Sequence, residues 1–131
     1  MTDRSSAQRP RFLADRCLGK VTVERLRVLG WDIVRLSEVF PDDGQAISDE
    51  TLLDHAAQEG WPVLTKDKRI RYQSSFHHAH TPVFAVSSGD LRIEGLVERL
   101  DAARRRIWEV AATRTGQFWI VYENGRIERR A

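Results

Sequence analysis

The sequence predicts an α/β domain with a mostly parallel central sheet, helices on both faces and a C-terminal hairpin. Short apolar runs alternate with segments of helical spacing, in the order strand, helix, strand, helix, strand, loop, strand, helix. Such alternation favours parallel strands joined by right-handed crossovers. The dipeptide Asn124-Gly125 stands between two further apolar runs and is typical of a hairpin with a type I′ turn.

Composition supports one compact domain. The chain has 131 residues, of which 41% are hydrophobic and 31% charged, which excludes collagen-like and broadly disordered classes. The polar, basic residues 1–10 are expected to form a loose leader, and residues 11–131 the single domain. The longest charge-free stretch, 72–89, contains three histidines and several serines, so no membrane span is expected.

A single cysteine, Cys17, excludes a disulfide framework and a cysteine-rich zinc site. Its presence suits a reducing cytosol, so we expect a cytoplasmic protein. Because no histidine partner is evident from the sequence, Cys17 is expected to be a buried small residue rather than a nucleophile.

The expected strands are short and apolar. Those that build the parallel part of the sheet are residues 12–14, 31–34, 61–65 and 83–86. The segment 40–47 contains Pro, Asp and Gly and is expected to be a loop. The hairpin strands are expected at 118–122 and 126–128.

The expected helices have their own start and stop signals. In 20–29 most apolar residues fall at helical spacing, and Gly30 follows where a left-handed C-terminal residue belongs. Ser48 is an N-cap residue for the next helix, which has acidic residues in its first turn and ends at Gly60. The segment 91–112 has one continuous apolar face and is expected to be the longest helix.

Three acidic segments are expected at one edge of the sheet. Asp15 follows the first strand, Asp67 follows the third, and Asp49 begins the helix that leads into the third. Sites in open α/β sheets lie outside the carboxyl ends of the strands. Carboxylates so close together raise one another's pKa values, and a divalent cation removes that cost. Oxygen ligands with water suit Mg²⁺ or Mn²⁺, which activates a water for attack on a phosphodiester.

Each acid also has an ordinary structural alternative. Asp15 could start a loop by bonding backbone amides, Asp49 could stabilise the helix start, and Asp67 could be an ion-paired turn residue. Helix geometry places Asp49 on the apolar face, towards the sheet, whereas Glu50 is rotated by about 100° around the helix axis. We therefore favour Asp49 as the third acid, with Glu50 as the second candidate.

Cations cluster around Asp67. Arginine outnumbers lysine 18 to 3, and two of the lysines, Lys66 and Lys68, flank this aspartate, with Arg69 close behind. Arginine suits bidentate contacts with phosphate. A solvated surface is the alternative for any single cation, and it is the expected role of the run 104–106.

At these residues the sequence resembles the PIN-domain ribonuclease superfamily, and within it the PIN-like toxins of VapBC-type toxin–antitoxin pairs. The resemblance covers roughly residues 11–129, and its most specific part surrounds Asp67. The matching segments are residues 12–19, 40–43, 48–50, 60–71 and 82–86, and the closing hairpin.

The resemblance implies a three-layer PIN-like fold and a metal-dependent endoribonuclease. It also implies Mg²⁺ or Mn²⁺ as cofactor, RNA as substrate, and inhibition by a cognate antitoxin, and it leaves a homodimer open as the assembly. Carried over by position, Asp15, Asp49 and Asp67 would be the catalytic metal ligands. Lys66, Lys68 and Arg69 would orient the phosphate of the substrate.

Two positions depart from the family pattern. Arg69 stands where relatives often place another aspartate, and Arg16 stands where they often have glutamate. Fewer carboxylates should mean weaker metal binding or one ion rather than two, and both arginines could hold the scissile phosphate. The departures favour an alternative, a catalytically silent PIN-like module that binds a partner protein or nucleic acid. A third option is a small phosphatase-like activity or a nuclease that acts on DNA.

Overall fold

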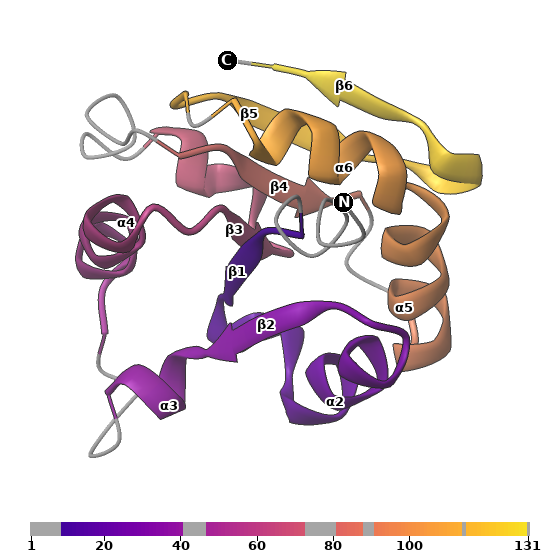
Figure 1. Cartoon of the computed structure of the whole chain (residues 1–131), viewed down its shortest axis with the longest axis horizontal. Helices are drawn as coiled ribbons and strands as arrows, with labels where there is room; N and C mark the ends of the chain where they lie inside the picture. The colour runs from indigo at the N-terminus through magenta and orange to yellow at the C-terminus, as the bar shows by residue number, and fades with distance from the viewer. Residues whose placement is uncertain (1–8, 41–46, 73–80, 88–90, 114, 131) are drawn as a thin grey trace, which may run out of the picture.

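The computed structural model describes residues 9–40, 47–72, 81–87, 91–113 and 115–130 (Figure 1). The strands of the described chain are β1 (Arg11–Ala14), β2 (Asp32–Arg35), β3 (Val63–Thr65), β4 (Val83–Val86), β5 (Phe118–Val121) and β6 (Ile127–Arg129). Its α-helices are α2 (Lys20–Val28), α3 (Leu36–Val39), α4 (Asp49–Glu59), α5 (Ile93–Ala102) and α6 (Arg104–Ala111). Short 3₁₀ turns are η1 (Arg16–Leu18), η3 (Lys68–Tyr72) and η5 (Glu123–Gly125).

The strands form one sheet in the order β2-β1-β3-β4-β5-β6. Every neighbouring pair is parallel except β5 and β6, which are antiparallel. The predicted mostly parallel sheet with a C-terminal hairpin is therefore confirmed. In the centre of the sheet, Leu13 of β1 lies opposite Val63 of β3, so these two strands end side by side.

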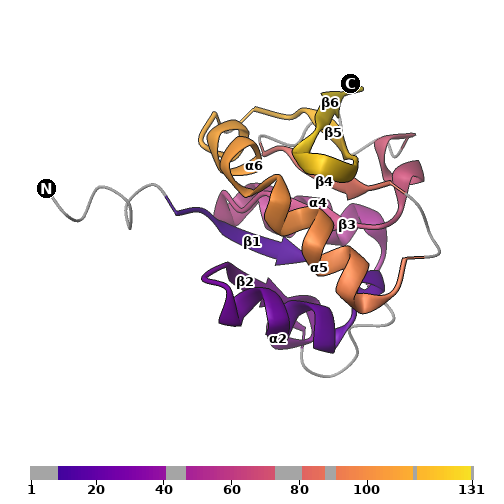
Figure 2. The ribbon, with the colours of Figure 1, turned by 90° about the vertical axis from the view of Figure 1, so that its right-hand side faces the viewer.

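Helices cover both faces of the sheet, which confirms the three-layer architecture. Helices α2, α5 and α6 lie on one face and α3 and α4 on the other (Figures 1 and 2). A hydrophobic core lies on each face of the sheet, and alternate residues of β1 point into one or the other. Phe12 and Ala14 pack with α2 and α5, whereas Leu13 packs with α4. This is the period-2 alternation of a strand that is buried on both faces.

The predicted ends of α4 are confirmed. The Ser48 hydroxyl accepts a hydrogen bond from the Thr51 N–H at 3.1 Å, which satisfies one of the unpaired donors of the first turn. Gly60 ends the helix in the left-handed conformation, with φ 75° and ψ 27°. The two caps fix where the helix begins, and so they fix the position of Asp49, its first residue.

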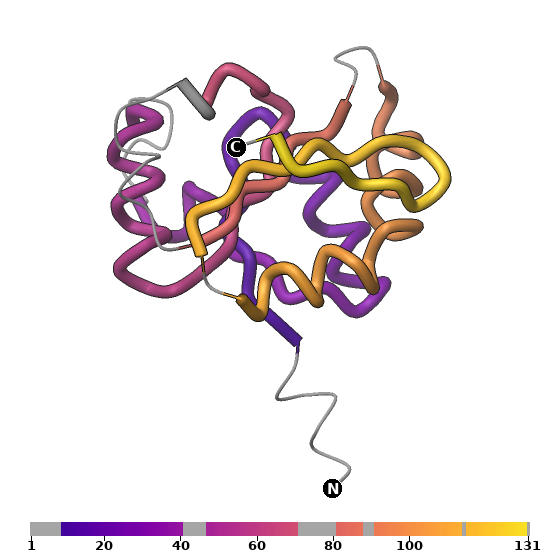
Figure 3. The backbone as a smooth tube through the Cα atoms, turned by 90° about the horizontal axis from the view of Figure 1, so that it is seen from above, coloured from indigo at the N-terminus to yellow at the C-terminus, as the bar shows by residue number. Residues whose placement is uncertain are grey.

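The predicted type I′ turn is also confirmed. Asn124 has φ 62° and ψ 31°, Gly125 has φ 77°, and the Arg126 N–H donates to the Glu123 carbonyl at 3.3 Å. Positive φ at both central residues matches the twist of the flanking strands. The turn lies against α5, as Figure 3 shows.

The prediction of one continuous helix over 91–112 is wrong. The segment forms two helices, α5 and α6, which are broken at Ala103 with φ −97° and ψ 7°. The break directs Arg104 between two tryptophans: its guanidinium lies 5.8 Å from the Trp31 ring centroid and 5.2 Å from that of Trp108. Its Nε also donates to Asp101 at 3.0 Å. These tertiary contacts bend the chain without glycine or proline, so the sequence pattern contains no sign of the break, and Arg104 departs from the expected solvated face.

Several sequence predictions lie outside the described residues. They concern most of the leader 1–10 and most of the loop 40–47, and the three histidines of the charge-free stretch, His77, His78 and His80, lie outside the described residues as well. The structure adds the short helix α3, for which the sequence made no prediction. None of the helices that the structure describes combines the length and the apolar character needed to cross a membrane.

We expect Gly125→Ala to destabilise the fold more than Gly60→Ala. Both glycines have positive φ, which costs an alanine about 1–2 kcal/mol. A Cβ at Gly60 meets nothing within 4 Å, whereas one at Gly125 would stand 2.9 Å from the Ala102 carbonyl oxygen. That overlap adds about 1–3 kcal/mol. Urea unfolding of the two variants measures the difference, and equal losses would contradict the close packing of the turn on α5.

Candidate functional site

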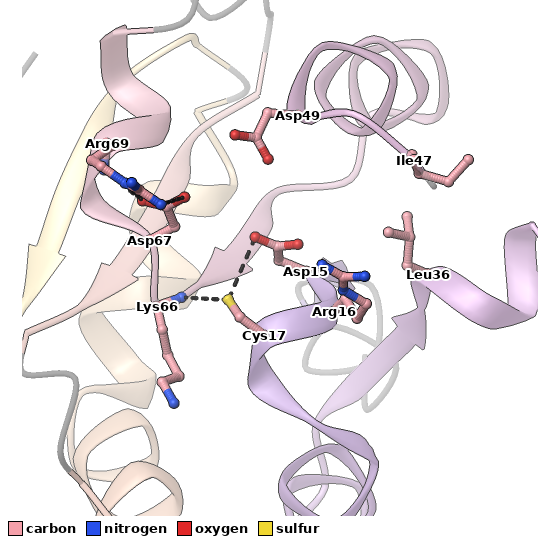
Figure 4. Close-up of a pocket in the computed structure, with 9 residues that line it drawn as sticks. All are labelled: Asp15, Arg16, Cys17, Leu36, Ile47, Asp49, Lys66, Asp67 and Arg69. Carbon is pink, nitrogen blue, oxygen red and sulfur yellow. Dashed lines mark hydrogen bonds and ion pairs between the residues drawn. The ribbon is translucent and has the colours of Figure 1, made fainter. Parts of the chain in front are cut away.

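A pocket of about 480 Å³ opens at the carboxyl ends of β1 and β3, the edge that the strand order predicts. Its walls come from η1, α3, the start of α4 and the segment after β3 (Figure 4). The lining residues are Asp15, Arg16, Cys17, Leu36, Ile47, Asp49, Lys66, Asp67 and Arg69.

The structure brings the three predicted aspartates together. Asp15 follows β1, Asp67 lies two residues beyond β3, and Asp49 is the first residue of α4. Their carboxylates point toward a common space (Figure 4). Glu50 is exposed and is not among the lining residues. As the apolar face of α4 predicts, Asp49 lines the pocket and Glu50 does not.

A buried hydroxyl that the sequence analysis missed joins two of these acids. Thr65, the last residue of β3, is fully buried. Its Oγ1 donates to Asp15 Oδ2 at 2.8 Å and accepts from the Asp67 N–H at 3.0 Å. One side chain therefore positions both the first carboxylate and the turn that carries the second. The sequence contained one sign of this role, because Thr65 is a polar residue at the end of an otherwise apolar strand.

Cys17 lies in the pocket wall, and the prediction that it is buried is wrong. Its sulfur accepts from the Lys66 N–H at 3.2 Å and lies 3.5 Å from Asp15 Oδ2. Partial burial of the sulfur, followed by the negative charge of Asp15, raises the pKa of the thiol. The thiol therefore stays protonated at neutral pH, and its lack of a nucleophilic role remains a prediction.

Asp67 is held by Arg69. The Arg69 backbone N–H and Nε both donate to Asp67 Oδ1, at 2.9 Å and 3.0 Å, and Nη2 donates to Oδ2 at 3.3 Å. The side-chain hydrogen bond from Arg69 is the main cause that lowers the pKa of Asp67. This carboxylate is ionised at neutral pH, and a guanidinium already covers both its oxygens.

The pKa of Asp49 is raised, whereas that of Asp67 is lowered. The Asp49 carboxylate makes no hydrogen bond or ion pair with the residues that the structure describes. Burial raises its pKa first, the charges of Asp15 and Asp67 raise it further, and Arg69 opposes them. Burial and the two neighbouring carboxylates therefore both make the ionisation of Asp49 costly.

The four predicted phosphate-binding cations are not equivalent. Arg16 and Arg69 line the pocket. Lys66 lines it as well, but its side chain extends away from the three carboxylates (Figure 4). Lys68 is exposed and is not a lining residue. The structure therefore brings two arginines, rather than the lysines, to the acids.

The donor set fits Mg²⁺ or Mn²⁺ in chemical kind, since all three groups are hard carboxylate oxygens beside open solvent. Within the described ranges, however, no three His, Cys, Asp or Glu side chains stand close enough together to hold an ion as they are. The oxygens of Asp67 are paired with Arg69, and Asp15 is bonded to Thr65. Metal binding at these residues would require the carboxylates to draw together.

A family model described as "PIN like domain" matches residues 10–88, well over half of the chain. The matched span includes β1 to β4 and all three aspartates of the pocket. Comparison with curated proteins finds no match, and comparison with solved structures finds none.

We expect Asp49→Asn to stabilise the metal-free protein at pH 7 by about 0.5 kcal/mol, at the low end of single stabilising changes. The raised pKa of Asp49 means that ionising it costs free energy in the folded state alone. This cost shrinks as pH falls through the raised pKa and disappears below the ordinary value of about 3.8, and the gain disappears with it.

Urea unfolding with EDTA, as a function of pH, measures the effect of Asp49→Asn. The matched control is Glu50→Gln, which removes a charge from the same first turn but outside the pocket. It loses about 0.3 kcal/mol or more of helix-dipole stabilisation. If both variants have a lower free energy of unfolding than the unmodified protein, the proposed repulsion between Asp49 and its acidic neighbours is contradicted.

Proposed function

The chain belongs to the family of PIN-like domains, and from this premise we propose that it is a metal-dependent endoribonuclease acting as the toxin of a type II toxin–antitoxin pair. The observation that carries the proposal is the meeting of Asp15, Asp49 and Asp67 in one pocket. They come from three separate segments, and ordinary turn or cap roles do not require them to meet.

Asp15, Asp49 and Asp67 would hold Mg²⁺ or Mn²⁺. When bound, such an ion supplies an activated water and neutralises charge on the phosphodiester. The raised pKa of Asp49, caused by burial and then by its two acidic neighbours, supports this role because a cation would relieve that repulsion. Thr65 would act as a positioning residue, since it holds Asp15 and the turn of Asp67 together.

The pocket arginines would bind the substrate phosphate. Arg16 and Arg69 line the pocket, and a guanidinium can present two parallel N–H groups to phosphate oxygens. Lys66 and Lys68 would add positive charge around the opening rather than a fixed contact. RNA as the substrate follows from the resemblance to VapBC-type toxins, and DNA is the comparison that the assay must include.

A second candidate function is a catalytically silent PIN-like module that binds a partner protein or nucleic acid. The specific observation that favours it is the ion pair of Arg69 with Asp67, at a position where relatives often place an acid. The silent module would bind RNA equally well with Mg²⁺ or with EDTA, because only the arginines would make contacts.

We expect the purified protein to cleave a mixed RNA substrate in Mn²⁺, and Asp15→Asn or Asp67→Asn to lower the rate by about a hundredfold or more. Each change removes one charged oxygen ligand with little change of shape. Gel analysis of the RNA measures the rate, and EDTA should remove it. A DNA strand of the same sequence tests the alternative substrate.

The matched control is Asp54→Asn, which removes an exposed carboxylate of α4 that is not a pocket residue. Its rate should equal that of the unmodified protein. If Asp67→Asn cleaves as fast as Asp54→Asn, the aspartates of the pocket do not carry the activity. If folded protein binds RNA without cleaving it in either ion, the silent module is the better proposal.

We expect expression of the protein in a bacterium to arrest growth, and Asp67→Asn to permit growth at the same protein level. A toxin of this class acts on RNA in the cytoplasm, so the arrest should depend on the pocket. Growth curves with an immunoblot for protein level measure it. Co-expression of the protein encoded by a neighbouring gene should restore growth and yield a stable complex. Growth arrest by Asp67→Asn as well as by the unmodified protein would contradict a nuclease toxin. Light scattering of the purified protein would show whether it is a homodimer.

A further inference from the structure

We propose that Arg69 is a tethered counter-ion that competes with the divalent cation for Asp67 and passes to the substrate phosphate when the cation binds. The inference rests on the proposed function, because it concerns the same pocket. It assigns to Arg69 a regulatory role that a phosphate contact alone does not imply.

The first argument is the occupancy of Asp67. Arg69 Nε lies 3.0 Å from Oδ1 and Nη2 lies 3.3 Å from Oδ2, so one guanidinium covers both oxygens. A cation needs at least one of these oxygens as a ligand. Three carboxylates therefore line one pocket, one of them is already paired with a guanidinium, and the described acidic groups form no cluster ready for an ion.

The second argument is that the pair can open at low cost. The Arg69 side chain is 86% exposed, whereas that of Asp67 is 23% exposed. Exposed ion pairs contribute little stability because water replaces the partner readily. The bond from the Arg69 backbone N–H to Asp67 Oδ1 does not involve the side chain, so the turn keeps its shape when the guanidinium leaves.

The third argument is charge. Arg69 pairs with Asp67 and lines the same pocket as Asp15 and Asp49, so it supplies to the pocket part of the positive charge that a cation would supply. A guanidinium and a divalent ion beside the same carboxylates repel each other. A phosphodiester brings the negative charge that the displaced guanidinium can bind at the mouth of the pocket.

The test is the affinity for Mn²⁺ alone, measured by calorimetry for the full chain without RNA. We expect Arg69→Gln to lower the Kd by roughly three- to tenfold, since it removes the competitor. Arg69→Lys, which keeps the charge but loses the fork, should lie between. The matched control is Arg105→Gln, which removes the same charge from an exposed arginine of α6 that is not a pocket residue. Its Kd should stay within about twofold of the unmodified protein.

A second measurement follows Arg69 itself. Its side-chain Nε–H resonance, assigned by its loss in Arg69→Gln, should move during a titration with diamagnetic Mg²⁺ as the pair with Asp67 opens. Urea unfolding should show that every variant is folded.

The outcomes separate this inference from the proposed function. Tighter Mn²⁺ binding by Arg69→Gln with a moving resonance supports the competition, even if RNA is never cleaved and the nuclease proposal fails. Equal or weaker binding, or a resonance that does not move while the metal binds, overturns the competition and leaves the metal site standing. No Mn²⁺ binding by any folded variant overturns both.

Discussion

The parallel pairing of β1 with β3 determines the rest of the site. Ala14 lies opposite Leu64, and the Asp15 N–H continues the ladder by donating to the Leu64 carbonyl at 2.9 Å. This register sets Asp15 beside Thr65, whose hydroxyl can then reach both acids. A slip of one residue would turn that hydroxyl to the opposite face of the sheet. The position of the pocket is thus a consequence of backbone hydrogen bonds between two strands that are buried except at Arg11, and its carboxylates need no flexible loop to hold them.

The site gathers charge at a cost, and Asp49 bears part of this cost. Asp15 is bonded to Thr65 and Asp67 to Arg69, while Asp49 has neither kind of partner in the described part of the chain. It is held there because Ser48 caps α4 and because the apolar stripe of that helix is buried against the sheet. Packing free energy thus keeps a carboxylate where its neighbours repel it, which is a common property of functional sites.

The sequence allowed the sheet, the type I′ turn and the meeting of the aspartates to be predicted, because each follows from local periodicity or strand direction. Other features depend on contacts between distant segments. The break at Ala103 arises because Arg104 reaches Trp31, which lies far away along the chain. Lys66 lines the pocket, but its side chain extends away from the carboxylates (Figure 4) because the chain bends directly after β3, and the charge cluster in the sequence does not show this. The pairing of Arg69 with Asp67 could not be predicted from the sequence, because it depends on the geometry of the turn. The position of Arg69 in the sequence fits a phosphate-binding role equally well.

Among the residues that the structure describes, the lining of the pocket contains three aspartates and three basic residues, so their formal charges balance before any ligand binds. If a divalent cation bound and displaced Arg69, two positive groups, the ion and the guanidinium, would stand where a phosphodiester would bind. Phosphate should therefore bind more tightly to the metal-loaded pocket than the ion alone explains. Thermodynamic linkage requires the reverse effect to be equally large, so RNA must raise the affinity for the cation by the same factor. A pocket of this kind would load its metal most fully when substrate is present, and Arg69 would couple the two events by pairing with the carboxylate in one state and with the phosphate in the other.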